Sequence, residues 1–290
     1  MPLAWQSPLP DTLTSSFNDM QIDVLIQTSP GRECNLEYCL RALKQQTVQE
    51  FGVMIIDDGS EQGQNIAQTQ CQNWKPFQYL WRDNDYCMSR SYNLGLQASQ
   101  ADWVVMLSGD VLLNPHAIGF YQQYVSQLPP MLIYGYFGNL RDEIRISQWF
   151  AERQVNLKDE RFAFDATGKL QFQQEMMSVP QHFAWGGNWA APRQDLHELG
   201  FNEAFTGWGL EDVDLANRWI AQGGQISFAI DVWGEHQIHE SPWNEKYYSQ
   251  NKSYVGVYAT PSQEPGLLYN PQFNLLSQIL GISIVNLDLG

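Results

Sequence analysis

Carboxylates follow two short apolar segments of this chain, and carboxylate oxygens are groups that can hold sugar hydroxyls, base N–H groups and divalent cations. Asp57 and Asp58 come directly after the apolar run Phe51–Ile56. Asp110 follows a second such run, Trp103–Leu107. The first pair could accept hydrogen bonds from a ribose or a ring N–H, and Asp110 could bind Mg²⁺ or Mn²⁺ on a diphosphate. Asp also favours turns, so neither motif is specific by itself.

A third acidic motif, GWGLED, begins at Gly207. Two glycines around Trp208 suit a loop whose backbone must approach another group closely. Glu211 and Asp212 then begin a stretch with helical spacing, where acidic side chains stabilise the positive end of a helix by about 0.3–1 kcal/mol. The helix end explains the charges but not the glycines. The same dipole should keep a carboxylate ionised, as a general base requires.

The segment HQIH contains a close histidine pair, His236 and His239. Two imidazoles three residues apart near acidic loops are a moderate sign of a metal site, although two ligands do not prove one. Three arginines near predicted strand ends, Arg32, Arg82 and Arg90, could bind an anion. Such local contacts outweigh the distant acidic surface, which salt screens over about 8 Å.

Strands and helices alternate in the first half of the chain and would position these residues. Each expected strand ends in polar residues, which predicts a mostly parallel, doubly wound α/β sheet. Ligands bind such sheets at the carboxyl ends of the strands, where the acidic turns fall. The expected strands are Gln21–Gln27, Phe51–Ile56, Phe77–Trp81 and Trp103–Leu107, and the expected helices are Asn35–Gln46 and Met88–Ala98.

The second half is less regular. We expect a strand at Met131–Phe137, an insertion or flexible loop region at Gly138–Pro180, and a helix at Glu211–Ile220. A final strand is expected at Gln225–Ile230, with the HQIH histidines just past it. The apolar tail Phe273–Leu289 should dock against its own domain; a peripheral membrane contact or a partner contact through this tail is the alternative.

Composition narrows the class of protein. The chain has 290 residues, of which 43% are hydrophobic, so it can bury a large core. A formal net charge of −16 argues against a general nucleic-acid binder. No apolar run approaches the 18 residues of a membrane-spanning helix. Four cysteines without a CxxC pair indicate a reducing compartment, so we expect a cytoplasmic protein, with membrane association through the tail as the alternative.

The order of the motifs resembles that of family-2-like GT-A glycosyltransferases, including galactosyltransferase-like and chondroitin-polymerase-like members with a WGxED motif. The resemblance covers about Gln21–Tyr248. It implies a GT-A fold with a nucleotide-sugar half at 18–115, an acceptor-binding and catalytic half at 116–260, and a C-terminal tail at 261–290. The segments that carry it are VLIQTSPGRECNLEYCLRALKQQT, VMIIDDGS, MSRSYNLGLQASQADWVVMLSGDV and WGGNWAAPRQDLHELGFNEAFTGWGLEDVDLANRWIAQGG.

The same resemblance implies a nucleotide-diphosphate-sugar donor, most often a UDP-sugar, a glycan or other hydroxyl acceptor, and Mn²⁺ or Mg²⁺. In such an enzyme Glu211 would bind an acceptor hydroxyl and Asp212 would be the catalytic base of an inverting transfer. The remaining implied roles are donor contacts by Asp57, Asp58, Arg90, Ser108 and Asp110, metal ligation by Asp110 with His236 and secondarily His239, and acceptor contacts by Trp185, Gly187, Trp189, Trp208 and Gly209.

Two departures from the family pattern keep alternatives open. Ser108 stands where the DxD motif has its first Asp, and Asn202 stands where the FDE motif has its Asp. A catalytically degenerate GT-A domain that only binds a nucleotide sugar or glycan is therefore one alternative, and a retaining mechanism is another. A dinucleotide-dependent oxidoreductase is disfavoured, because the chain reads TSPGREC where a G-x-G-x-x-G fingerprint would stand.

Overall fold

The computed structural model describes residues 20–139, 159–164, 170–207, 209–240, 245–256 and 265–268. Their strands are β1 (Ile22–Thr28), β2 (Gly52–Asp57), β3 (Phe77–Trp81), β4 (Trp103–Ser108), β5 (Val111–Leu113), β6 (Leu132–Asn139), β7 (Phe162–Phe164), β8 (Leu170–Phe172), β9 (Asn188–Pro192), β10 (Ile226–His236) and β11 (Gly266–Leu268). The helices are α1 (Glu33–Leu43), α2 (Gly63–Cys71), α3 (Met88–Ala98), α4 (Ala117–Gln127), α6 (Gln174–Ser178), α7 (Arg193–Leu199), α8 (Glu211–Ala221), α9 (Glu245–Tyr254) and the 3₁₀ helix η2 (Pro180–Phe183).

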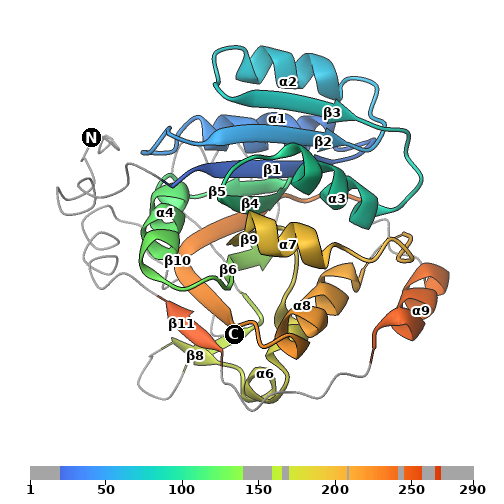
Figure 1. Ribbon diagram of the computed structural model, residues 1–290. Helices are drawn as coiled ribbons and strands as arrows, with labels where there is room; N and C mark the ends of the chain where they lie inside the picture. Colours follow the sequence, from blue (N-terminus) through green and yellow to red (C-terminus); the bar gives the residue numbers. More distant parts are fainter. Residues whose placement is uncertain are drawn as a thin grey trace.

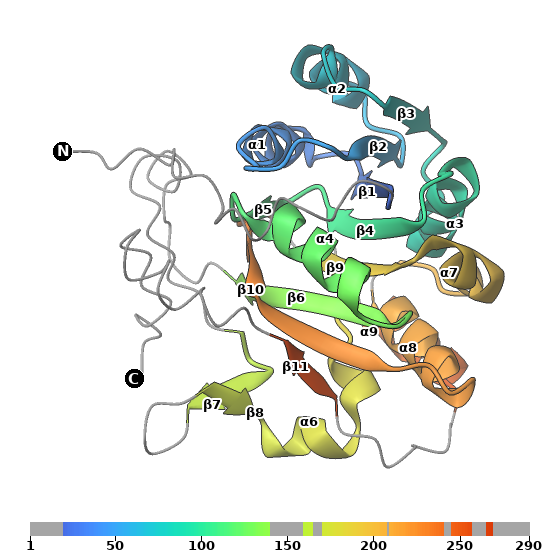
Figure 2. The same cartoon turned by 60° about the vertical axis from the view of Figure 1, so that its left-hand side comes forward.

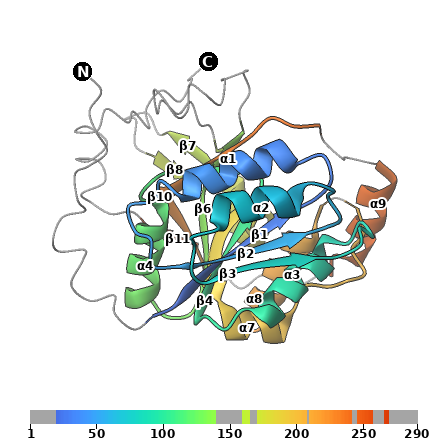
Figure 3. The ribbon, with the colours of Figure 1, turned by 90° about the horizontal axis from the view of Figure 1, so that it is seen from above.

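A nine-stranded sheet runs through the molecule in the order β11-β10-β6-β9-β4-β1-β2-β3, with β5 paired to β10 (Figure 1). Helices α1 and α4 lie on one face of this sheet, and α3, α7 and α8 lie on the other (Figure 2). Seen from above, α1 and α2 run side by side over β1, β2 and β3 (Figure 3). This arrangement is the mostly parallel, doubly wound α/β sheet that the sequence predicts.

The strands β1 to β4 form the regular part of the sheet. β1 pairs in parallel with both β2 and β4, and β2 pairs in parallel with β3. The apolar side chains of β1, β2 and β4 are buried on both faces, as in parallel sheets covered by helices, whereas those of the edge strand β3 are partly exposed. Gly95 lets α3 pack closely here, because a Cβ at this position would lie 2.8 Å from the side chain of Ile56. The helix predicted at Met88–Ala98 and the strand predicted at Phe77–Trp81 are confirmed.

The rest of the sheet departs from the prediction. β9, formed by part of the WGGNW segment, lies antiparallel between β4 and β6, and we expected no strand there. β10 does not end at Ile230, because a bulge between Ala229 and Trp233 carries the strand on to His236. The buried Asp231 in this bulge accepts a hydrogen bond from the hydroxyl of Tyr124 at 2.5 Å. The strand is also not the last, since β11 follows it.

The expected loop region Gly138–Pro180 contains regular structure where it is described. β7 and β8 pair in antiparallel orientation, and α6 follows them.

Most of the predicted tail, including Phe273–Leu289, lies outside the described residues, so its docking stays a prediction. No helix among the described segments is both long and apolar enough to cross a membrane. The sheet continues across the predicted boundary at residues 115/116.

Candidate active site

Both carboxylate oxygens of Asp57, the last residue of β2, accept hydrogen bonds from neighbouring groups of the protein. Its Oδ1 accepts a hydrogen bond from the backbone N–H of Ser60 at 2.8 Å. Its Oδ2 accepts hydrogen bonds from the hydroxyls of Ser60 and Tyr79, the latter at 2.5 Å. The side chain is fully buried. Asp57 therefore shapes the end of the strand and leaves Asp58 as the better placed of the two predicted nucleotide contacts.

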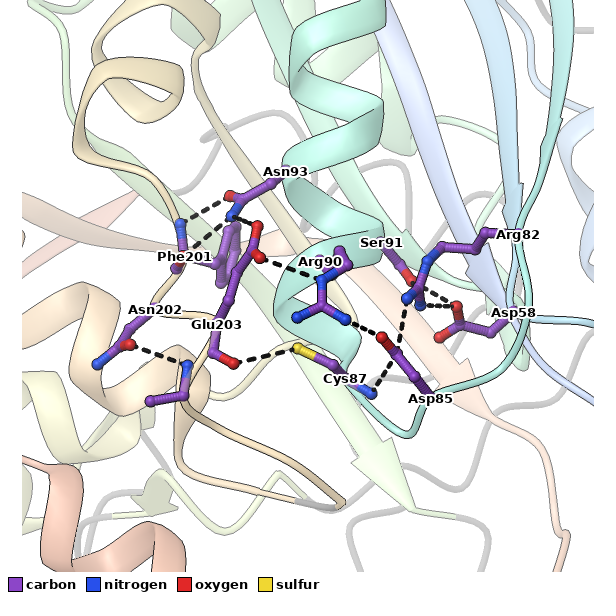
Figure 4. Close-up of polar contacts among 11 residues, drawn as sticks. Asp58, Arg82, Asp85, Cys87, Arg90, Ser91, Asn93, Phe201, Asn202 and Glu203 are labelled. Carbon is purple, nitrogen blue, oxygen red and sulfur yellow. Dashed lines mark hydrogen bonds and ion pairs between the residues drawn. The ribbon is translucent and has the colours of Figure 1, made fainter.

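Asp58 lies at the carboxyl end of β2 and is held by two side chains from the next elements (Figure 4). Oδ1 forms an ion pair with Arg82 and accepts a hydrogen bond from the hydroxyl of Ser91 at 2.7 Å. The sequence singles out Arg82 as a possible anion contact but does not pair it with Asp58. A guanidinium and a hydroxyl on one carboxylate oxygen fix the direction of that carboxylate.

Arg90, predicted to contact the donor, points away from Asp58 in Figure 4. It forms ion pairs with Asp85 and with Glu203, whose Oε2 lies 3.1 Å from Nε of Arg90. Asn93 donates a second hydrogen bond to Glu203 at 3.0 Å, and these two contacts lower the pKa of Glu203. Asp85 in turn bonds Arg82 at 2.6 Å, so a chain of alternating charges joins Asp58 to Glu203.

The substitution in the FDE motif has little structural consequence. The side-chain oxygen of Asn202 accepts a hydrogen bond from the backbone N–H of Ala204 at 3.0 Å (Figure 4). An Asp oxygen would accept the same bond. The remaining acid, Glu203, makes the contacts that cross to α3. The motif thus keeps a positioning function without its first carboxylate.

Asp110 converges with His236 and His239, although it lies more than one hundred residues away in the chain. Asp110 Oδ2 lies 3.0 Å from Nε2 of His239, and Oδ1 lies 3.5 Å from Nε2 of His236. The two Nε2 atoms are 3.0 Å apart. All three potential ligand atoms lie within 4.8 Å of one another. The sequence predicts this trio, but it places His236 past a strand, whereas His236 is the last residue of β10.

This trio fits a divalent cation. Oδ1 of Asp110 is buried and accepts no hydrogen bond, which is unusual for a buried carboxylate oxygen. Burial by itself would raise the pKa of Asp110, but His236, His239 and Ser108 outweigh it and hold the pKa well below its usual range. The carboxylate is therefore ionised, as a metal ligand must be.

Gln237 ties the histidine segment to its surroundings. Its backbone N–H donates to the carbonyl of Asp110 at 2.8 Å. Its fully buried side chain donates to the carbonyl of Asn35 at 2.9 Å. On the same side of the site, Arg32 donates to the carbonyl of Glu240 at 2.8 Å. The first turn of α1 and the loop before it thus hold the segment that carries both histidines.

The loop before β9 connects the DxD-like turn to the acidic helix. The backbone N–H of Ser108 donates to the carbonyl of Gly187 at 2.9 Å. Gly187 has a φ of +108°, which a residue with a side chain rarely adopts. One residue earlier, the N–H of Gly186 donates to Oδ2 of Asp212 at 2.6 Å. Ser108 and Asp212 are thus joined through one short loop.

Glu211 and Asp212 lie in the first turn of α8, as predicted. Asp212 also accepts a hydrogen bond from the backbone N–H of Val213 at 2.8 Å on Oδ1. Burial raises the pKa of both carboxyls, and the charge of Asp212 adds to the effect on Glu211. The backbone N–H groups at the helix end favour the charged form of Asp212, as expected, but desolvation acts in the opposite direction and is the larger effect. A carboxyl with a raised pKa accepts a proton more readily near neutral pH.

Tyr92 on α3 marks where the acidic loops meet, and the sequence gives no sign of this role. Its buried ring lies 4.7 Å from that of Phe201. Burial raises the pKa of the Tyr92 hydroxyl far above its usual value, and the nearby carboxylates add to the rise. Those carboxylates are Glu211, Asp212, Asp110 and Asp58. These carboxylates come from the turn after β2, from the turn between β4 and β5 and from the first turn of α8, and the charges of all four act on one phenol.

The predicted acceptor residues divide into three groups. Trp185 is half-buried, with its ring 5.6 Å from the guanidinium carbon of Arg161, and it directly precedes Gly186. Gly209 lies three residues before Asp212 with a φ of +98°. Trp189 belongs to the core instead, since it is 2% exposed and stacks on Tyr134, so it cannot stack on an acceptor. Trp208 lies outside the described residues.

An open α/β sheet with acidic loops gathered at the carboxyl ends of its parallel strands defines the GT-A fold class. Solved structures support this class. The chain superposes on S. aureus TarS 1-349 in complex with UDP-GlcNAc with a TM-score of 0.59 and 13% identity, covering 80% of this chain and 64% of that one. It also superposes on GalNAc-T7 with UDP, GalNAc and Mn²⁺, with a TM-score of 0.57 and 12% identity over 78% of this chain and 44% of that one.

The family follows from the sequence comparison. The model of glycosyl transferase family 2 matches residues 28–200, more than half of the chain, and the model described as the N-terminal domain of galactosyltransferase matches residues 169–236. The chain belongs to glycosyl transferase family 2.

Two curated relatives are each 26% identical to this chain. One is the validoxylamine A glucosyltransferase of Streptomyces hygroscopicus subsp. limoneus, matched over 239 residues, 76% of this chain and 52% of the relative. The other is the hyaluronan synthase of Pasteurella multocida, matched over 243 residues, 75% of this chain and 24% of the relative. The chain therefore spans about half, or less, of the length of these relatives.

Proposed function

We propose that this chain is an inverting, metal-dependent glycosyltransferase that moves a sugar from a nucleotide-diphosphate sugar, most simply a UDP-sugar, to a hydroxyl of a glycan or glycoconjugate. Family membership supports the reaction class, and the UDP-GlcNAc and UDP named for two solved structures of the same fold support the donor class. The observation that carries the proposal is the gathering of Asp110 with His236 and His239, joined to Asp212 through the hydrogen bonds of Ser108 to Gly187 and of Gly186 to Asp212.

The nucleoside end of the donor belongs at Asp58. Arg82 and Ser91 hold one carboxylate oxygen, so the group is ordered before a ligand arrives. Ribose hydroxyls and the ring N–H of uracil are donors that a fixed carboxylate can accept. Asp57 and Arg90 act indirectly here, Asp57 by shaping the turn and Arg90 through Asp85. Ser108 and Arg32 are placed to approach the diphosphate.

Asp110, His236 and His239 would hold the metal ion. Of the two expected ions we favour Mn²⁺, because Mg²⁺ prefers an octahedron of oxygen ligands with several waters, whereas this set offers two imidazoles. Bound there, the cation would stabilise negative charge on the diphosphate that leaves. The ligand set is independent of Ser108, so the loss of the first Asp of the DxD motif does not remove the site.

Asp212 is placed to act as the base. The N–H groups of Gly186 and Val213 fix its two oxygens, so the carboxylate has a defined direction. It takes the proton of the acceptor hydroxyl as the hydroxyl oxygen bonds to the anomeric carbon. The bond from that carbon to the diphosphate oxygen breaks, and the nucleoside diphosphate leaves with the electron pair. Attack opposite the leaving group inverts the anomeric centre.

Glu211 and the flanking loops would hold the acceptor. Burial raises the pKa of Glu211, so this carboxyl can share a proton with a sugar hydroxyl. Trp185 and Gly187 would border the acceptor on one side, and Gly209 on the other. A contribution of about 10²–10⁴-fold is typical of a general base, which sets the scale for removing one.

The test is transfer by Asp212→Asn. The amide keeps an oxygen for one of the two backbone N–H groups but cannot take the proton, so kcat should fall by about 10²–10⁴-fold while the melting temperature falls by only a few degrees. Asp195→Asn is the matched control, because Asp195 is an exposed acid in the first turn of α7. Near-normal turnover of Asp212→Asn would contradict the base assignment.

Donor use and stereochemistry are read on the wild-type chain. A thermal-shift panel of nucleotide sugars with Mn²⁺ should identify the donor, since a ligand at 100 times its Kd adds about 2.7 kcal/mol of stability. Release of the nucleoside diphosphate from the best donor would exclude a domain that only binds. Proton NMR of the product should give the inverted anomer, and retention would contradict the mechanism.

A further inference from the structure

The loop that leads into the acidic helix has an unusual backbone. Gly207, Gly209 and Leu210 have φ values of +69°, +98° and +77°. Glycine adopts such angles freely, but leucine does not, so the residue directly before α8 is strained. Leu210 also starts the helix, because its carbonyl accepts the N–H of Asp214 at 2.9 Å. Strain of this kind persists only where the surroundings enforce it.

Asn251 on α9 supplies an enforcing contact. Its side chain is fully buried. The amide nitrogen donates to the carbonyl of Thr206 at 3.0 Å and to the carbonyl of Gly209 at 3.0 Å. The amide oxygen accepts the N–H of Thr206 at 3.4 Å. One side chain thus binds the backbone on both sides of Trp208.

The same face of α9 packs on this loop with its aromatic rings. Tyr247, Asn251 and Tyr254 are spaced four and three residues apart, so they lie on one side of the helix. A Cβ on Gly207 would lie 2.6 Å from the ring of Tyr247, so the loop backbone is pressed against this ring. The rings of Tyr254 and Phe205 meet edge to face at 5.7 Å.

The nucleotide half holds the loop from its other side. The N–H of Gly207 donates to the carbonyl of Tyr86 at 2.6 Å. Tyr86 precedes α3 and itself has a φ of +60°. The loop is therefore fixed between α9 and the segment before α3, and the only residues between it and Asp212 are Leu210 and Glu211.

We propose that Asn251 is a positioning residue for Asp212, acting through its hydrogen bonds to the backbone of Thr206 and Gly209. The inference rests on the proposed function, because it assumes that Asp212 acts on an acceptor hydroxyl. No described contact joins Asn251 to Asp58 and its partners Arg82 and Ser91, or to Asp110 and its partners His236 and His239. Its removal should therefore impair the transfer step and leave donor and metal binding intact.

The experiment compares Asn251→Ala and Asn251→Ser with Lys252→Ala, a substitution of the next, exposed residue of the same helix. Each variant is assayed for kcat, for the KM of donor and acceptor, and for the thermal shift given by UDP with Mn²⁺. A shift of about 1 Å in a reacting group can cost about 10²-fold in rate. We expect Asn251→Ala to lose about 10–100-fold in kcat, with donor KM and the UDP shift within about twofold of wild type.

Asn251→Ser should fall between wild type and Asn251→Ala, because its hydroxyl can donate to one of the two carbonyls. A folded Asn251→Ala with wild-type kcat would overturn the inference, and so would a parallel loss of UDP binding, which would indicate general disruption. Loss of cooperative unfolding in both variants would make Asn251 a folding residue and overturn its positioning role. If the wild-type chain neither transfers sugar from a donor nor hydrolyses a donor, the proposed function fails, and the positioning role of Asn251 is not what failed.

Discussion

The two halves of the molecule treat their carboxylates in opposite ways. In the nucleotide half, Asp58 is paired with Arg82, and Asp57 accepts hydrogen bonds from Ser60 and Tyr79. In the acceptor half, Glu211 and Asp212 accept hydrogen bonds from backbone N–H groups. Within the described part of the chain, no cation forms an ion pair with either. The pKa of these two carboxyls is raised.

Under the proposed function, this difference in how the carboxylates are paired gives the two halves different roles. A carboxylate whose oxygen is fixed by a guanidinium and a hydroxyl is suited to hold a ligand in a defined direction. A carboxyl without a cation and with a raised pKa accepts a proton more readily, as a catalytic base must. Under the proposed function, donor binding and proton transfer therefore fall to different halves, and variants of single residues can test this separation.

The largest effect should come from the metal ligands, which lie where the halves meet. We expect His236→Ala to weaken Mn²⁺ binding, measured by electron paramagnetic resonance, by well over tenfold, because one of three protein ligands is lost. Transfer should fall with it. His197→Ala, an exposed histidine on α7, is the control. Unchanged Mn²⁺ affinity in His236→Ala would remove His236 from the ligand set.

A donor-half variant should change binding without changing chemistry. Asp58→Asn loses the charge that Arg82 and the nucleoside share, so donor KM should rise about tenfold, equivalent to about 1.4 kcal/mol. The kcat at saturating donor should stay within about threefold. Asp83→Asn, at an exposed neighbouring acid, should leave both constants unchanged. A fall in kcat with an unchanged donor KM would reverse the roles of the two halves.

The pH dependence should belong to the acceptor half. The base must be deprotonated, so kcat should be constant above the raised pKa of the Glu211–Asp212 pair and fall about tenfold per pH unit below it. Donor affinity at saturating Mn²⁺ should not follow this limb, because the pKa of Asp110 is lowered and its charge persists. Metal affinity depends on pH where imidazoles are ligands, so kcat and donor Kd are measured at saturating Mn²⁺ between about pH 5 and about 9. A kcat that stays level down to pH 5 would contradict the raised pKa.

The smallest effect should come from the exposed chain of charges that links the halves. Arg90 and Glu203 have side chains 47% and 45% exposed, and exposed ion pairs contribute about 0–1 kcal/mol. Glu203→Gln should therefore lower the melting temperature by only a few degrees and change transfer by less than about threefold. A tenfold loss of activity would show that the link matters more than its exposure implies.

The regular half could be predicted from the sequence and the irregular half only in part. Apolar runs ending in polar turns locate Asp58 and Asp110 at strand ends, because burial on both faces gives a strong local pattern. The strand β9 gives no such pattern: its partners β4 and β6 are remote in the chain. Asp231 interrupts the apolar run of β10, and a bulge bonded to Tyr124 accommodates it.

Several side chains of the candidate site depend on contacts that no local pattern encodes. Tyr92 reads as an ordinary core residue of a helix, and Asn251 as a polar residue in a hydrophilic stretch. The helix end favours the charged form of Asp212, but burial, which depends on the whole fold, raises its pKa. Residue types and motif order lead to candidate residues, and tertiary packing decides their contacts and protonation.

The most direct test of the account is a crystal structure with Mn²⁺ and UDP, with data collected at a wavelength where manganese scatters anomalously. We expect one strong anomalous peak among Asp110, His236 and His239, with the diphosphate next to this peak. The uridine should lie at Asp58, and Asp212 should face the side of the site that UDP leaves free. A peak elsewhere, or a diphosphate bound away from Asp110, would contradict the convergence of the two halves on one site.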